Sequence, residues 1–126
     1  MNLNQVTMPS LNVEDATEFY KTLGLKLIVD ALPRYVRFEC LDGDATFSIH
    51  KVEKISKNEG ITLYFEVKNL VETVSELKQK GIIFNTEIKE QPWLWNEIHL
   101  KDPDYNNIII YNAGKNRKNP PWRVNK

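Results

Sequence analysis

The fold is decided by residues 3–25, which read LNQVTMPSLNVEDATEFYKTLGL. In the first seven residues the side chains alternate, so that Gln5 and Thr7 share one face of a strand and Val6 and Met8 share the other. Asn12 then follows as a helix cap, with apolar residues at helical spacing behind it, and Gly24 can end the helix in the left-handed conformation. The stretch therefore predicts a strand followed directly by an amphipathic helix.

The same pattern returns 57 positions later, in residues 62–81, which read TLYFEVKNLVETVSELKQKG. A shift of this length places Asn12 on Asn69 and Gly24 on Gly81. The residue that caps the helix and the glycine that ends it therefore occupy corresponding positions in the two halves. Each half continues with three more predicted strands, which read LKLIVD, YVRFEC and ATFSIH in the first half and GIIFNTE, WNEIHLK and NIIIYN in the second. We therefore predict an α+β fold made of two βαβββ modules.

Three segments carry a resemblance to a known family: residues 3–25, residues 62–81 and LKDPDYNNIIIYNAG at 100–114. Together they resemble the vicinal oxygen chelate superfamily, which includes glyoxalase I, bleomycin and fosfomycin resistance proteins and extradiol dioxygenases. The resemblance implies strands that curl into an incomplete mixed β-barrel around one cleft, usually in a homodimer. It divides the chain into one domain at 1–114 (module one 1–50, linker 51–60, module two 61–114) and a basic tail at 115–126.

The resemblance also implies where a metal would be held, on the first and last strand of each module. The corresponding positions in this chain are Gln5, Ser48, Thr62 and Ile109. Divalent metals of this kind prefer imidazole nitrogen and carboxylate oxygen, and none of the four side chains offers either. We therefore predict no metal at these positions and no cofactor.

Strand alternation predicts a polar face lining the cleft and an apolar face against the helices. We expect ligand-binding side chains on the polar face, namely Gln5, Arg37, Glu39, Ser48, Tyr64, Trp95, Glu97 and Tyr111. Their acids must be solvated, paired with Arg37 or a histidine, or bound to a cation, because an unpaired buried carboxylate is costly. In the loop PWLW, parity allows one indole into the cleft, and Trp95 is the one chosen as an aromatic wall.

Two functional interpretations remain open. One is a binding protein, similar to bleomycin resistance proteins, that holds a small polar or cationic molecule. The alternative is a lyase, transferase or dioxygenase-type enzyme, with a displaced divalent metal or acid/base groups at His50, Glu66 and His99. Cys40 falls on the apolar face and is interpreted as a small core residue.

Charge and composition limit the partners. Lys plus Arg and Asp plus Glu number 17 each, so no overall field attracts nucleic acid or an acidic membrane. A single cysteine excludes an internal disulfide, and no apolar segment resembles a signal peptide or membrane span, which favours a cytoplasmic protein. The tail has five basic residues and two prolines, predicts no helix, and is either an arm across a partner subunit anchored by Trp122 or a frayed end.

Overall fold

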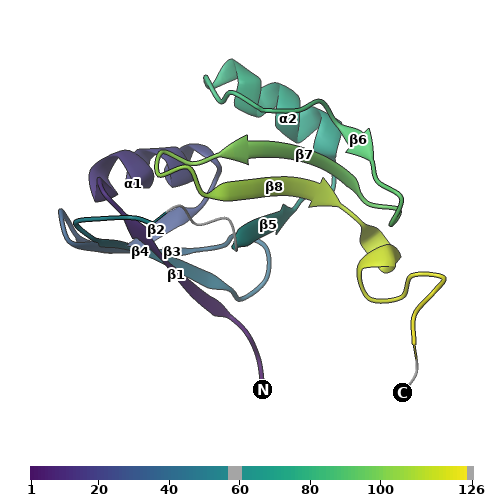
Figure 1. Ribbon diagram of the computed structural model, residues 1–126, viewed down its shortest axis with the longest axis horizontal. Helices are drawn as coiled ribbons and strands as arrows, with labels where there is room; N and C mark the ends of the chain where they lie inside the picture. Colours follow the sequence, from purple (N-terminus) through teal and green to yellow (C-terminus); the bar gives the residue numbers. More distant parts are fainter. Residues whose placement is uncertain (57–60, 125–126) are drawn as a thin grey trace. The chain divides into compact units, whose positions relative to one another are not determined.

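The computed structural model describes residues 1–56 and 61–124 and divides them between two compact units. The first unit holds Met1–Glu59 together with the loop Asp102–Tyr105, and the second holds Gly60–Lys101 and Asn106–Lys126. Each unit contains one four-stranded mixed sheet and one long helix (Figure 1). The predicted α+β class and the repeated βαβββ order are confirmed.

The first sheet has the order β1-β4-β3-β2, with β1 and β4 parallel and the other pairs antiparallel. Its strands are β1 (Gln5–Ser10), β2 (Lys26–Ala31), β3 (Tyr35–Glu39) and β4 (Thr46–Lys51), and α1 spans Val13–Thr22. The rings of Tyr20 on α1, Phe38 on β3 and Phe47 on β4 form the centre of its core, with centroids 4.7 to 6.4 Å apart.

The second sheet repeats this arrangement in the order β5-β8-β7-β6, again with its first pair parallel. Its strands are β5 (Thr62–Glu66), β6 (Lys89–Glu90), β7 (Asn96–Lys101) and β8 (Asn107–Asn112); α2 spans Leu70–Gln79, and a 3₁₀ helix, η1, spans Gly114–Arg117. On α2 the apolar residues Leu70, Val74 and Leu77 recur at helical spacing, and all three are buried.

Both helices begin and end in the same way. The side chains of Asn12 and Asn69 each accept a hydrogen bond from the main-chain N–H three residues on, at 3.1 Å in both cases. At the other end Gly24 and Gly81 have φ angles of +106° and +92°, which suit glycine at a helix C-terminus. The repeat seen in the sequence is therefore a repeat of capping geometry.

The strand predicted from GIIFNTE, residues 81–87, is wrong, because pairing with β7 begins only at β6. The N–H of Ile82 instead closes α2 by bonding to the carbonyl of Leu77. Further along, Asn85 donates its N–H to the carbonyl of His99 at 2.8 Å, but His99 donates its own N–H to the Thr86 hydroxyl at 3.0 Å, where a ladder would need a main-chain carbonyl. A loop therefore replaces most of the expected edge strand.

Asp102–Tyr105, which begins with the DPD of the KDPD loop, belongs to the first unit although its sequence lies in the second half of the chain. The hydroxyl of Tyr20 donates to Asp102 Oδ2 at 2.6 Å, and Leu11 donates its N–H to Asp104 Oδ1 at 2.8 Å. Tyr105 has a φ of +64°, so the turn keeps the left-handed conformation that glycine would favour and places a tyrosine in it. Among the described residues, no helix is long and apolar enough to cross a membrane.

Candidate functional site

The polar face of the first sheet is organised around Ser48, whose side chain is fully buried. Gln5 donates its amide N–H to Ser48 Oγ at 2.7 Å, and the hydroxyls of Thr7 and Ser48 lie 2.7 Å apart. The amide oxygen of Gln5 accepts a hydrogen bond from the Thr46 hydroxyl. Both ends of the Gln5 amide are therefore bonded within the sheet.

Tyr35 and Arg37 form a second group on this face. Arg37 donates its Nε–H to the Tyr35 hydroxyl at 3.0 Å, and its guanidinium carbon lies 5.6 Å from the centre of the same ring. A hydrogen bond from Ser48 lowers the pKa of Tyr35 below its usual value, and Arg37 lowers it further, although partial burial opposes both effects. Tyr35 is not among the ligand-binding candidates from the sequence, although it stands two residues before Arg37 on β3 and so shares its face.

Of the alternatives expected for the acids, solvent exposure applies to Glu39, and Arg37 is not its partner. Glu39 pairs instead with Lys26 on the neighbouring strand, with their charged atoms 3.7 Å apart and both side chains well exposed. Such an exposed pair contributes little to stability. His50 lies exposed on β4, opposite Tyr35, while Glu66 and His99 lie in the second unit. Neither unit therefore brings together all three of the residues considered for an acid/base or displaced metal site.

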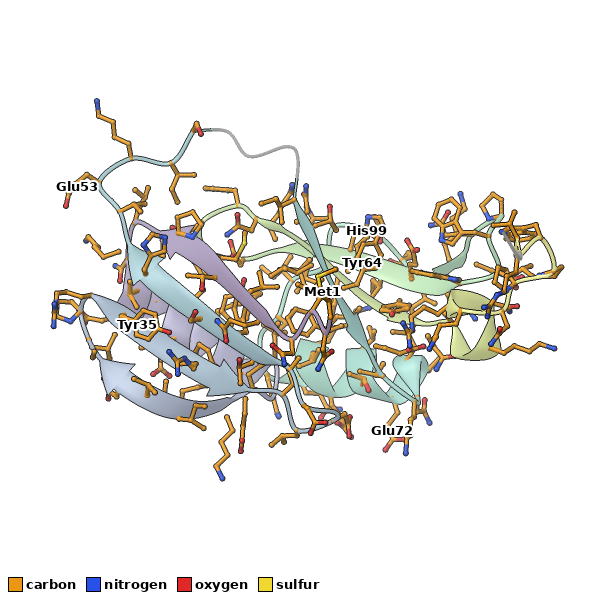
Figure 2. All side chains as sticks on the ribbon, turned by 90° about the horizontal axis from the view of Figure 1, so that it is seen from below. Met1, Tyr35, Glu53, Tyr64, Glu72 and His99 are labelled. Atoms are coloured by element: carbon orange, nitrogen blue, oxygen red, sulfur yellow. The ribbon has the colours of Figure 1, made fainter. Side chains whose placement is uncertain are left out.

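Three aromatic rings form a cluster on the polar face of the second sheet, which we call the ring cluster: Tyr64, Trp95 and Tyr111. Trp95 stacks on Tyr111, with centroids 4.8 Å apart and planes 20° apart. Tyr64 stands perpendicular to both rings, at 5.5 Å from Tyr111 and 5.8 Å from Trp95. Tyr64, which is labelled in Figure 2, remains 48 % exposed, so one ring of the cluster is open to solvent.

The residues that follow β8 hold the ring cluster in place. Trp95 donates its indole N–H to the carbonyl of Asn116 at 3.2 Å. Glu66 accepts hydrogen bonds from the N–H groups of Ala113 and Gly114, and one of its oxygens lies 3.7 Å from Arg117. Contrary to the prediction of no helix, the basic tail begins with η1, and these contacts fix that helix beside the sheet. Trp122, proposed as the tail's anchor, is 55 % exposed.

Burial and neighbouring carboxylates raise the pKa values of two tyrosines of the ring cluster, the half-exposed Tyr64 and the buried Tyr111. Burial, and then the negative charge of Glu97, raise the pKa of Tyr64. Burial and the charge of Glu66 raise the pKa of Tyr111, with Arg117 opposing. Both phenols therefore stay neutral at physiological pH and can donate hydrogen bonds.

Glu97 lies next to His99 on β7, and its side chain is only 1 % exposed. One carboxylate oxygen is 3.0 Å from His99 Nε2, and the other accepts the indole N–H of Trp93 at 2.9 Å. The expectation that parity admits one of the two indoles to this face is wrong. Trp93, Trp95 and Glu97 follow one another at a spacing of two residues, which puts side chains on the same side of an extended chain, and Trp93 bonds to Glu97 although β7 itself begins only at Asn96.

A pocket of about 350 Å³ adjoins His99 within the second unit. Its polar lining comes from His99, Lys101, Thr62, Asn85, Thr86 and Asn107. The loop residues Asn85 and Thr86 could not be foreseen, since the sequence assigns them to a strand. In the first unit, Cys40 is half-buried at the end of β3 rather than a core residue, and burial raises the pKa of its thiol.

The glyoxalase-like domain family matches residues 3–113, nearly the whole chain. This protein belongs to the glyoxalase-like domain family. Solved structures with the same fold include lactoylglutathione lyase from Agrobacterium tumefaciens, with 15 % identity, a TM-score of 0.72 and coverage of 89 % of this chain and 93 % of that one. A glyoxalase/bleomycin resistance protein/dioxygenase from Nocardioides has 17 % identity and a TM-score of 0.76, covering 99 % and 90 %.

A bleomycin-binding protein crystallised with bleomycin is also similar, with 16 % identity, a TM-score of 0.71 and coverage of 89 % of this chain and 98 % of that one. At these identities the likeness establishes the shared fold. None of the curated protein sequences matches this chain.

The metal positions implied by this family can be tested against the side chains present. Gln5 and Ser48 use their polar atoms on each other and on neighbouring threonines. Thr62 offers a neutral hydroxyl, and Ile109 is a buried hydrocarbon. This donor set does not fit a divalent metal, which needs charged oxygen or imidazole ligands. Among residues 1–56 and 61–124, moreover, no three His, Cys, Asp or Glu side chains are grouped so that they could hold one.

Proposed function

We propose that this glyoxalase-like protein binds a small polar or cationic molecule on the polar face of its second sheet, without a metal at the positions implied by the family. The observation that carries the proposal is the ring cluster. Its rings lie within 6 Å of one another, and Tyr64 is half exposed, which leaves aromatic surface for a ligand. The face of an aromatic ring attracts cations, and desolvation strengthens the attraction.

The charges around the ring cluster favour a cationic ligand over an anionic one. Glu97 lies close enough to raise the pKa of Tyr64, and Glu66 close enough to raise that of Tyr111. Arg117 offsets part of the charge of Glu66, whereas Glu97 contacts only the neutral Trp93 and a histidine among the contacts described. A cation above Tyr64 would therefore meet both an aromatic face and a net negative field.

The contacts from the tail support binding because they organise the rings in advance. The bond from Trp95 to Asn116 orders one ring directly, and the bonds from Ala113 and Gly114 to Glu66 order the segment after β8 that supplies Asn116. Rings that are already ordered lose less conformational freedom when a ligand arrives. The bleomycin-binding neighbour supports the same class of function, and bleomycin is the first ligand to test.

The second candidate is a lyase, transferase or dioxygenase-type enzyme that uses His50, Glu66 or His99. One observation favours it, namely the contact between His99 and the buried carboxylate of Glu97. Glu66 is already engaged by two main-chain N–H groups and Arg117, which leaves it poorly suited to proton transfer. A homodimer and a cytoplasmic location also remain predictions from the sequence and its resemblance.

Isothermal titration with bleomycin and with choline, in the presence of a chelator, tests the binding proposal. We expect Trp95→Leu to weaken binding of the tighter ligand about tenfold, because it removes the central ring, and a tenfold change corresponds to roughly 1.4 kcal/mol. Trp122→Leu changes an exposed indole outside the ring cluster and should leave binding unchanged. Binding that is equal in wild type and Trp95→Leu, or that requires added metal, would contradict the proposal.

A further inference from the structure

The basic tail is folded where it follows β8. After η1, Asn119 donates its N–H to the carbonyl of Lys115 at 2.7 Å, and Arg123 donates its N–H to the carbonyl of Pro120 at 3.0 Å. The guanidinium of Arg123 also donates to the carbonyl of Lys118 at 3.2 Å. These bonds turn the chain back on itself in the segment drawn in yellow in Figure 1. The tail therefore has a defined shape of its own.

This shape presents cations around an exposed indole, a surface that we call the basic patch: Lys115, Lys118, Trp122 and Arg123. Trp122 is 55 % exposed. Within residues 1–56 and 61–124, none of the three cations of the basic patch forms an ion pair with a carboxylate, whereas Arg117 of the same tail pairs with Glu66. The charges and the apolar surface of the basic patch are therefore available to a partner.

The loop between β3 and β4 has the opposite charge around an exposed apolar side chain. Cys40 donates its N–H to the carbonyl of Ala45 at 3.0 Å, which closes the hairpin. Beyond this bond lies what we call the acidic tip: Leu41, Asp42 and Asp44. Leu41 is 70 % exposed, and neither aspartate side chain bonds to another residue in the described part of the chain. Neither the acidic tip nor the basic patch includes a metal position implied by the family.

The distribution of charge favours a second copy of this chain as the partner of the basic patch. The tail 115–126 has five basic residues and no acid in a chain with 17 charges of each sign, so the remainder has a net charge of minus five. That remainder would repel a nucleic acid or an anionic membrane, whereas a second copy offers the acidic tip. Trp122 and Leu41 both remain exposed, so each has apolar surface left for a partner.

We infer that the basic patch of one copy docks on the acidic tip of a second copy, with Trp122 against Leu41 and the tail cations beside the two aspartates. The two surfaces are much smaller than the roughly 20 to 30 residues a side of a standard interface, so the association should be weak. Because its charges are exposed, it should also weaken as salt is added. The docking does not involve the ring cluster, and its test is independent of the binding proposed there.

Charge reversal on each surface gives the sharpest test. The acidic-tail variant is Lys115→Glu with Lys118→Glu, and the basic-tip variant is Asp42→Lys with Asp44→Lys. All four side chains are exposed and have no described bond, so both variants should keep the fold. Within either variant, tail and tip have the same sign and repel each other. In a mixture of the two variants, each tail meets a tip of opposite sign only on the other variant.

The measurement is fluorescence anisotropy of one protein labelled at its N-terminal amine and titrated with the other, at about 50 mM salt, where screening of surface charges is weak. We expect wild type to self-associate and each variant alone to associate about tenfold more weakly. The mixture of the two variants should recover the wild-type affinity to within roughly threefold. Trp122→Ala should weaken wild-type association about tenfold, because it removes the exposed indole.

A matched control separates this contact from attraction between net charges. Lys51→Glu with Lys54→Glu has the same net charge as the acidic-tail variant but an unchanged tail, and it should bind the basic-tip variant more weakly than the acidic-tail variant does. Equal binding by these two would overturn the inference.

The remaining outcomes are equally decisive. Absence of wild-type self-association, equal association in all combinations, or a loss on reversing the tail but not the tip would overturn the inference, the last because the tail then meets some other acidic surface. Recovery with all four changes in one chain, but not in the mixture, would place the contact within a single chain and would overturn it as well.

Discussion

Tyr20 connects the first helix to the KDPD loop through a single hydrogen bond in the core. The residue is fully buried, and its hydroxyl donates to Asp102 Oδ2 at 2.6 Å. Burial raises the pKa of Tyr20 far above its usual value, and the charge of Asp102 adds to this effect. The phenol is therefore held in its neutral, donating form.

Tyr20→Phe should lower the free energy of unfolding by about 2 kcal/mol, since bonds to charged groups contribute roughly 1.5 to 3 kcal/mol. Urea unfolding at pH 8 measures the change. Tyr105→Phe is the matched control, because that side chain is 80 % exposed and should lose almost nothing. Equal losses in the two variants would show that the bond to Asp102 contributes no stability.

The same bond predicts how stability depends on alkaline pH. Tyr20, Tyr64 and Tyr111 all have raised pKa values, so above about pH 10 the unfolded chain releases protons that the folded chain keeps. Stability should therefore fall as pH rises through that region, and Tyr20→Phe should make the fall shallower. Unfolding curves at pH 8 and pH 10.5 test this, and parallel falls in wild type and variant would contradict it.

Tyr35 should behave in the opposite way to the buried tyrosines. Its pKa is lowered by Ser48 and Arg37, so it should ionise before Tyr20, Tyr64 and Tyr111 as pH rises. Titration of the tyrosinate absorbance near 295 nm follows this directly. We expect Tyr35→Phe to remove an early part of the curve and Arg37→Met to move that part to higher pH. A curve unchanged in both variants would show that Arg37 does not act on Tyr35.

At the scale of elements, the two helices share one capping device. The side-chain oxygens of Asn12 and Asn69 each accept a main-chain N–H at 3.1 Å, and Asn69 also donates to the carboxylate of Glu72 at 3.1 Å. These caps satisfy N–H groups that have no partner inside the helix.

Asn12→Ala and Asn69→Ala should each lower the free energy of unfolding by about 1 kcal/mol, the typical cost of losing such a cap. Thermal or urea unfolding measures the change, and Asn2→Ala, at an exposed position near the start of the chain, is the control. Because Asn69 has the additional bond to Glu72, its loss should be the larger of the two. A variant as stable as the control would mean that its cap is replaced by water at no cost.

Individual elements also differ in how far the sequence predicts them. The caps, the helix stripes and most strands follow from local patterns, because each depends on residues close together in the chain. The prediction for residues 81–87 fails because the Thr86 side chain takes the place of a main-chain partner, which no periodicity reveals. The prediction that one indole enters this face fails because Trp93 and Trp95 are two residues apart, a spacing that puts both side chains on the same side of an extended chain.

At the scale of the whole molecule, the internal repeat and the family resemblance were sufficient to predict the α+β class. Only part of the candidate site could be predicted from the sequence. Strand parity placed Trp95 with Tyr64, Glu97 and Tyr111, but the contact of Trp95 with Asn116 depends on how η1 folds back after β8. The pairing of Glu66 with Arg117 depends on the same fold of η1.

The central claim is that this glyoxalase-like chain does not act through a divalent metal at Gln5, Ser48, Thr62 and Ile109. Equilibrium dialysis against zinc and against nickel, followed by elemental analysis of wild type and Gln5→Ala, tests it most directly. We predict no stoichiometric metal in either protein and no difference between them, since the donor set lacks charged oxygen and imidazole. About one ion per chain in wild type that is lost in Gln5→Ala would contradict the account.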